Sequence, residues 1–201
     1  MRSLRRFLST VTFACVLPGA VVAQGALFPK PGEANPAQAS AATFYNIGKM
    51  NILQGAEKMP AEHYSYQPTK DVRTFAAVVA HIADAQFIFC SAARKEPNPN
   101  GENLQSGQVT QTIETSGKHS KTEIVAALKR SFEYCDPVFA GGNDASWSET
   151  VRLNAAERPK ATPLLLALIH MWEHYGNMTT YLREKGIVPP STERLQQRRR
   201  P

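Results

Sequence analysis

The residues best suited to chemistry are two histidines four positions apart, His170 and His174. In an α-helix this interval places both imidazoles on one face, about one turn apart, which suits two ligands of one small cation. Neutral imidazole is the commonest metal ligand among protein side chains. Two packed, hydrogen-bonded core histidines show the same spacing, so the pair alone leaves both metal binding and a structural role open.

A third histidine, His81, lies in another segment with helical periodicity. The predicted faces of the three histidines otherwise hold mostly apolar residues: Thr74, Ala77, Val78, Ala85 and Ile88 beside His81, and Pro163, Leu166, Ala167 and Met178 beside the pair. Three imidazoles directed at an apolar interior favour a bound cation, because uncompensated buried polar groups are costly. Asp84, one turn after His81, is either an acceptor that fixes an imidazole tautomer or a carboxylate at the surface or a helix end.

The remaining polar and aromatic candidates are interpreted as non-catalytic. His63 and His119 fall in predicted loops among polar residues, so we expect them to be solvent-exposed and non-ligating. Glu173 lies off the histidine face and is expected to be a solvated helix residue rather than a general base. Three tyrosines are expected to pack in the core or at its rim: Tyr134, Tyr175 and Tyr181.

Two helices are predicted in the first half of the domain. The first covers residues 37–59 and closes before Pro60, because the residue before proline avoids helix. Its apolar residues recur at helical steps: Ala41, Phe44, Ile47, Ile52 and Met59. The second begins at Asp71 or Thr74 and runs to residue 93, before a segment rich in proline and asparagine.

Two further helices are predicted in the second half. The third opens with the capping-box pattern Ser120-Lys121-Thr122-Glu123 and ends or kinks at Pro137. The fourth has Thr162 as its cap and runs to residue 185, with Gly186 as a left-handed stop. Only residues 146–153 hint at strand-like alternation, so the domain is predicted to be all-α, a four-helix bundle.

The connection between the second and third predicted helices is too long for a hairpin. It holds 26 residues, whereas antiparallel helical hairpins use about 2 to 8. Such a chain can retrace a helix of about 30 Å, so the two helices can run parallel. Cys90 and Cys135 would then lie at the same end of the bundle. A disulfide between them is favoured over two buried free thiols.

The residue pattern at the start of the chain predicts export, and the pattern at its end predicts a solvated tail. Residues 1–23 combine a basic start, a mostly apolar run and small residues before Gln24, which is the pattern of a cleaved signal peptide. A membrane anchor or a lipoprotein is less well supported by this segment. Residues 24–36, with three prolines and two glycines, are interpreted as a linker. The bundle is predicted to cover 37–192, and 193–201 to be a basic, disordered tail.

The net charge of +6 comes from these ends. Residues 7–192 hold 16 basic and 16 acidic side chains, because three arginines precede them and four follow, against one glutamate. A nucleic-acid-binding protein needs lysine and arginine clustered on one face to displace counterions from phosphates. We therefore expect no nucleic-acid partner, and no membrane partner once the signal peptide is removed.

Several motifs resemble the DinB/YfiT-like family of small bundles, which is distinct from the DNA polymerase of similar name. They are Met59-Pro60-Ala61-Glu62-His63-Tyr64-Ser65-Tyr66-Gln67-Pro68-Thr69, Arg73-Thr74-Phe75, Val79-Ala80-His81-Ile82-Ala83-Asp84, His174-Tyr175-Gly176-Asn177 and Tyr181-Leu182-Arg183-Glu184-Lys185-Gly186-Ile187-Val188-Pro189-Pro190. The resemblance covers residues 37–192 and implies a bundle with a long crossover between helices two and three. It also implies a metal site on His81, His170 and His174. Asn177 stands where relatives often have Gln, which leaves its role open.

The resemblance further implies a class of chemistry. Relatives include thiol-dependent S-transferases and enzymes with hydrolase or isomerase activity, and three nitrogen ligands leave a position for water or substrate. We expect one divalent metal, zinc or nickel, in an exported, periplasmic or extracellular enzyme that acts on a small molecule as a thiol transferase or hydrolase. The alternatives are a non-catalytic, stress-related metal- or ligand-binding protein and a structural bundle with core histidines. Homodimerisation is left open.

Overall fold

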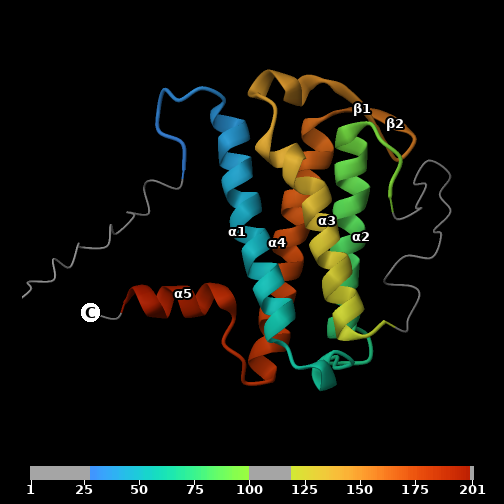
Figure 1. Cartoon of the computed structure of the whole chain (residues 1–201), viewed down its shortest axis with the longest axis vertical. Coiled ribbons are helices and arrows are strands. Elements are labelled where there is room, and N and C mark those ends of the chain that lie inside the picture. Colours follow the sequence, from blue (N-terminus) through green and yellow to red (C-terminus); the bar gives the residue numbers. More distant parts are fainter. Residues whose placement is uncertain (1–27, 100–118, 200–201) are drawn as a thin grey trace, which may run out of the picture.

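Four long helices pack side by side in the computed structural model, which describes residues 28–99 and 119–199 (Figure 1). The long helices are α1 (Pro36–Lys58), α2 (Phe75–Arg94), α3 (Lys121–Ala140) and α4 (Ala161–Glu184). The shorter elements are η2 (Ala61–His63), η3 (Asp144–Ser148), β1 (Thr150–Leu153), β2 (Ala156–Pro159) and α5 (Pro190–Arg198). The predicted all-α bundle is confirmed. The predicted signal peptide, residues 1–23, lies outside the described residues.

Local capping explains where α2 and α3 begin. The Thr74 side chain accepts a hydrogen bond from the Ala77 N–H at 3.1 Å. The predicted capping box of α3 is present, because Ser120 Oγ accepts from the Glu123 N–H and the Glu123 carboxylate accepts from the Ser120 N–H at 2.8 Å. These bonds satisfy amides that have no partner within the helix.

The structure corrects two predicted helix boundaries. Thr162 does not cap α4, because Ala161 is already helical and follows Lys160 without a side-chain cap. Pro137 does not end α3, which continues to Ala140. Proline removes the hydrogen bond to the carbonyl four residues earlier. Both Pro137 and Glu133, which carries that carbonyl, are exposed, so water can replace the lost donor.

The buried face of the first helix matches the prediction at Ala41, Ile52 and Met59 but not at Phe44. Phe44 is 47 % exposed and packs against Phe28, with ring centroids 5.3 Å apart. Tyr45 and Gly48, each one residue after a predicted position, are buried as well. Gly48 permits close contact with α4, since a Cβ there would lie 2.7 Å from Met171 Cε. The helix thus turns a tyrosine and a glycine, rather than Phe44, toward the core.

A short β-hairpin follows α3 in the region where strand-like alternation was noted. β1 and β2 pair antiparallel, with Leu153 opposite Ala156. The turn residues Asn154 and Ala155 both have positive φ, 51° and 61°, as a two-residue hairpin turn of type I′ requires. Val151 and Leu153 are buried, so the hairpin adds an apolar face next to α2 without changing the helical class.

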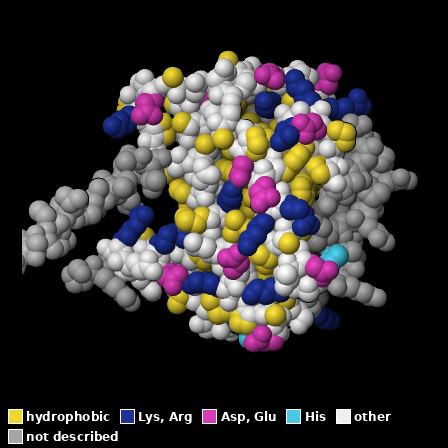
Figure 2. Space-filling view, in the orientation of Figure 1, with side chains coloured by type: hydrophobic (Ala, Val, Ile, Leu, Met, Phe, Trp, Pro, Cys, Tyr) yellow, Lys and Arg dark blue, Asp and Glu magenta, His cyan; other side chains and the backbone are white. Residues whose placement is uncertain are grey.

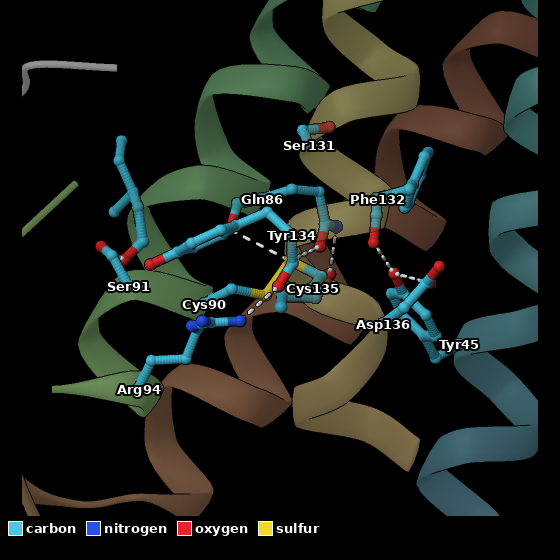
Figure 3. Close-up of a disulfide and its surroundings, with 12 residues drawn as sticks. Tyr45, Gln86, Cys90, Ser91, Arg94, Ser131, Phe132, Tyr134, Cys135 and Asp136 are labelled. Carbon is cyan, nitrogen blue, oxygen red and sulfur yellow. Dashed lines mark hydrogen bonds between the residues drawn. A yellow bond between two sulfur atoms is a disulfide. The ribbon is translucent and has the colours of Figure 1, made fainter. Parts of the chain in front are cut away.

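A disulfide joins α2 to α3 (Figure 3). The Cα atoms of Cys90 and Cys135 are 5.4 Å apart, and both residues are fully buried. Each cysteine lies in the C-terminal part of its helix, so α2 and α3 run parallel. The predicted long crossover and the favoured pairing are both confirmed.

The predicted disordered tail is wrong for residues 193–198, which belong to helix α5. Lys58 Nζ of α1 lies 2.6 Å from a Glu193 carboxylate oxygen, and the Arg194 guanidinium donates to Gln54 Oε1 at 3.1 Å. Pro190 starts this helix, because proline is compatible with the first helical position. The basic end of the chain therefore contacts α1.

Of the helices that the structure describes, α2 is the one long and apolar enough to cross a membrane. However, 67 % of its most apolar 18-residue window is buried in the bundle. Core helices of soluble proteins pass the same test. On the face of the molecule in Figure 2, basic and acidic side chains are interspersed.

Candidate metal centre

Three imidazoles meet between α2 and α4. His81 comes from α2, and His170 and His174 come from consecutive turns of α4. The Nε2 atom of His170 lies 3.0 Å from Nε2 of His81 and 3.1 Å from Nε2 of His174. The structure therefore brings together the three residues predicted from the sequence, and their candidate ligand atoms lie within 4.8 Å of one another.

The rings meet through their nitrogen-bearing edges rather than by stacking. Their centroids are 4.3 to 4.9 Å apart, and the planes are inclined by 54° between His81 and His170, 86° between His81 and His174, and 74° between His170 and His174. Inclined rings with facing nitrogens can direct three lone pairs at one point. Such an arrangement is compatible with three ligands on one side of an ion.

The spacing of the ring nitrogens fits a divalent cation, and so does the fact that each neutral imidazole has only one N–H proton. Zinc–nitrogen bonds of about 2.0–2.1 Å in a tetrahedral site separate two ligand nitrogens by about 3.3 Å, close to the observed contacts. A neutral imidazole carries a proton on only one nitrogen, so Nε2 of His170 cannot donate to both neighbours. A cation at the shared point would satisfy all three lone pairs. Imidazole nitrogen suits zinc and nickel alike.

The candidate site is buried on one side and accessible on the other. His174 is 6 % exposed, while His81 and His170 are half-buried. Ala167 and Met171 are fully buried beside the pair. These surroundings protect one side of the ligand set and leave the side of His81 and His170 within reach of solvent.

An apolar rim flanks His170. Phe89 lies with its ring centroid 5.8 Å from that of His170, at an interplanar angle of 72°. Leu166, predicted to face the core, is 37 % exposed, and Ile169 is 63 % exposed. Leu166 thus lies at the edge of the helix interface, one turn before His170.

The structure shows the surroundings of two polar residues close in sequence to the histidines, Asn177 and Asp84. The Asn177 side-chain amide lies 3.2 Å from Nδ1 of His174, so Asn177 contacts the ring nitrogen that faces away from the other histidines. Asp84 is 3 % exposed and lies within α2, so the alternatives of a surface or helix-end carboxylate are wrong. The sequence placed Asp84 correctly one turn from His81 but did not reveal its burial.

The residues predicted to be non-ligating are outside the cluster. His119 is exposed and lies 4.0 Å from a Glu123 carboxylate oxygen, as expected for a surface residue. His63 is half-buried in η2 rather than exposed. Glu173 is exposed on α4, as predicted.

The three tyrosines act as packing residues. Burial, followed by a hydrogen bond to Glu96, raises the pKa of Tyr134 to about 12. Burial also raises the pKa of Tyr181, whose hydroxyl donates to the Arg73 carbonyl at 2.6 Å. Tyr175 donates to Ser191 Oγ at 2.8 Å. These contacts join α3 and α4 to neighbouring segments, as expected for packing residues.

Comparison with known proteins identifies relatives of this bundle. A sequence model described as the DinB superfamily matches residues 47–178. Uncharacterized protein YjoA of Bacillus subtilis (strain 168) is 25 % identical over 134 residues, covering 65 % of this chain and 79 % of YjoA.

Solved structures show the same fold. The crystal structure of YjoA, a DinB-like protein, aligns with a TM-score of 0.54 and 19 % identity over 73 % of this chain and 92 % of YjoA. A DinB-like protein from Bacillus cereus ATCC 10987 gives 0.57 and 14 %, over 74 % and 94 %. A mycothiol-dependent maleylpyruvate isomerase gives 0.54 and 12 %, over 70 % and 60 %. Because the sequence model spans more than half of the chain and includes all three histidines, this protein belongs to the DinB superfamily.

Proposed function

We propose that this protein is an exported, metal-dependent enzyme that acts on a small molecule and holds one divalent ion on His81, His170 and His174. The observation that carries the proposal is the convergence of three Nε2 atoms, with contacts of 3.0 and 3.1 Å, from two different helices. Zinc or nickel is the proposed ion, since both accept imidazole nitrogen.

A metal held by three histidines would keep a coordination position open, which supports a catalytic role. Three protein ligands are the usual number in catalytic zinc sites, which keep the fourth position for water or substrate. A bound ion would supply a water acidified toward hydroxide, or hold a substrate thiol as thiolate. The half-buried side of His81 and His170 is where a small molecule can approach, and Phe89, whose ring centroid lies 5.8 Å from that of His170, provides an apolar contact there. Hydrolase and thiol transferase chemistry both fit this arrangement.

The Cys90–Cys135 disulfide supports export. Structural disulfides persist in the periplasm and outside the cell and are rare in the cytosol of mesophiles. The bridge is fully buried in the core. Together with the signal-peptide pattern of residues 1–23, it favours a periplasmic or extracellular location. Such a location makes intracellular thiol cofactors less available, which favours the hydrolase over the thiol transferase.

The second candidate is a non-catalytic metal- or ligand-binding protein. It is favoured by the composition of the cluster, which among the described residues consists of three histidines without a carboxylate or cysteine. Glu173, the nearest carboxylate in sequence, is exposed and lies off the histidine face. Both candidates require a bound ion, and only the enzyme requires turnover.

Elemental analysis of the mature protein tests the metal site. We expect about one divalent ion per chain in the wild type and at least a tenfold lower content in His170→Ala. His63→Ala is the matched control, since His63 lies outside the cluster, and should retain the ion. Equal metal content in the wild type and His170→Ala would remove the site assignment.

Turnover and location are tested separately. The metal-loaded wild type and His170→Ala are compared in ester hydrolysis and thiol-transfer reactions on model substrates. A reaction that is lost in His170→Ala supports the enzyme, while a full metal site without turnover favours the binding protein. Export predicts that the protein recovered from the periplasm or the medium begins at Gln24, as read by N-terminal sequencing.

A further inference from the structure

Asn177 contacts the most buried of the three histidines. Its side-chain nitrogen Nδ2 lies 3.2 Å from Nδ1 of His174, while Nε2 of the same ring faces His170 at 3.1 Å. The two residues are three positions apart on α4, an interval at which side chains of one helix meet. The contact is therefore made within a single helix and does not depend on packing between helices.

The partner of Nδ1 influences which nitrogen of a neutral imidazole carries the proton. Binding a cation through Nε2 requires the proton on Nδ1, and that N–H needs an acceptor. An asparagine amide can meet either need, because its nitrogen donates and its oxygen accepts. The two groups exchange places when the amide rotates by half a turn. One small side chain can thus support both tautomers of His174.

We propose that Asn177 is a positioning residue that controls the tautomer of His174, and that its amide rotates when the metal binds. With Nδ2 facing Nδ1, as in the structure, the amide supports the His174 tautomer protonated on Nε2. Rotation presents Oδ1 to Nδ1, which then carries the proton and leaves Nε2 as a ligand. This inference rests on the proposed metal site.

Two substitutions separate this role from simple packing. Asn177→Asp keeps the shape and offers only acceptor oxygens, so it holds the Nδ1–H tautomer before any ion binds. Asn177→Leu keeps a similar volume and offers neither donor nor acceptor. Thr180 is exposed one turn further along α4. Thr180→Leu and Thr180→Asp are therefore matched controls for the added apolar group and the added charge.

Zinc affinity is measured by competition with a chromophoric chelator at pH 7.5. Loss of an outer hydrogen-bond partner of a ligating histidine typically weakens metal binding about 10- to 100-fold, so Asn177→Leu should lose affinity by that factor. Asn177→Asp should bind at least as tightly as the wild type, and both Thr180 variants should stay within about twofold. A change of less than twofold in Asn177→Leu would overturn the inference while leaving the metal site intact.

The tautomer of His174 is read directly in the metal-free protein by long-range nitrogen–proton NMR. Wild type should carry the proton mainly on Nε2, Asn177→Asp mainly on Nδ1, and Asn177→Leu should shift the wild-type ratio. An identical ratio in wild type and Asn177→Leu would refute the role of Asn177 whether or not zinc binds. Absence of zinc binding by the wild type would instead refute the proposed function. Far-ultraviolet circular dichroism verifies that each variant is folded.

Discussion

Reduction of the Cys90–Cys135 disulfide should remove about 4 kcal/mol from the free energy of unfolding. The bridge closes a loop of 45 residues. In the chain-entropy model a loop of this length restricts the unfolded chain by about 13 cal/mol/K, which is about 4 kcal/mol at 25 °C. For a domain of this size, each kcal/mol changes the melting temperature by about 2–4 °C. We therefore expect the melting temperature to fall by about 8–16 °C.

The groups around the disulfide affect how much free energy of unfolding is lost on reduction. Cys135 Sγ lies 3.3 Å from the Gln86 carbonyl oxygen and 3.2 Å from Gln86 Oε1. After reduction the thiol can donate a weak hydrogen bond to one of these oxygens. Such a bond contributes at most about 1 kcal/mol to stability. The expected net loss therefore stays near 3 kcal/mol or above.

Urea denaturation followed by helical circular dichroism measures the loss. The protein is reduced in denaturant, refolded with reductant and compared with the oxidised form, both without metal. Cys90→Ala/Cys135→Ala is the control, because its midpoint should not respond to reductant. Alkylation and mass spectrometry verify that both thiols are free. A loss below about 1 kcal/mol in fully reduced protein would contradict the chain-entropy reasoning.

Three further predictions concern the helices. Ser120→Ala removes the cap of α3 and should cost about 1 kcal/mol in urea denaturation, whereas Thr122→Ala, exposed in the first turn, should cost less. Gly48→Ala places a methyl group against Met171 and Trp172 of α4, and this crowding opposes the gain of about 1 kcal/mol in helix propensity, so the same assay should show no net stabilisation; a gain of about 1 kcal/mol would contradict the close contact. The hydrogen bond from Arg94 holds the pKa of Glu96 below its ordinary value. Its stabilising effect is therefore present above pH of about 4.3 and lost as pH falls through the lower folded pKa, so wild type and Glu96→Gln should differ in melting temperature at pH 7 and converge in acid.

The bundle and its topology could be predicted because their signals are local or depend on chain length. The Ser120–Glu123 capping box needs only four consecutive residues, and the structure contains it. The connection after α2 is too long for a hairpin, which indicated parallel helices and one shared end for Cys90 and Cys135. Neither inference needs knowledge of distant contacts.

The predictions fail where contacts between residues far apart in the sequence determine which side chains are buried and which segments are ordered. Phe44 and Tyr45 both fit an apolar face of α1, and Tyr45 is the one that packs against α3, on Phe132 and Phe139. Residues 193–198 have little apolar character, and α5 is instead held to α1 by polar contacts such as Lys58–Glu193. Periodicity within one segment contains no information on such partners.

The three histidines of the candidate site were predictable from the sequence. The interval between His170 and His174 fixes their common face, and the pattern around His81 indicated the third candidate ligand. Whether Asn177 contacts Nδ1 or points to solvent depends on a side-chain rotamer, which spacing alone does not determine. The burial of Asp84 likewise follows from the packing of α2 against its neighbours.

Helix α2 links the disulfide to the candidate metal site. Cys90 attaches α2 to α3, and His81, nine residues earlier and about 13 Å along the helix axis, faces α4. The ligand set crosses only the α2–α4 interface, where Ala167 is fully buried and Gln86 donates to its carbonyl at 3.4 Å. Gln86 also contacts the bridge, since its Oε1 lies 3.2 Å from Cys135 Sγ, so this one side chain connects the disulfide to the α2–α4 interface. Because the disulfide acts mainly on the unfolded chain, its reduction should lower the stability of the bundle far more than the metal affinity of the molecules that remain folded.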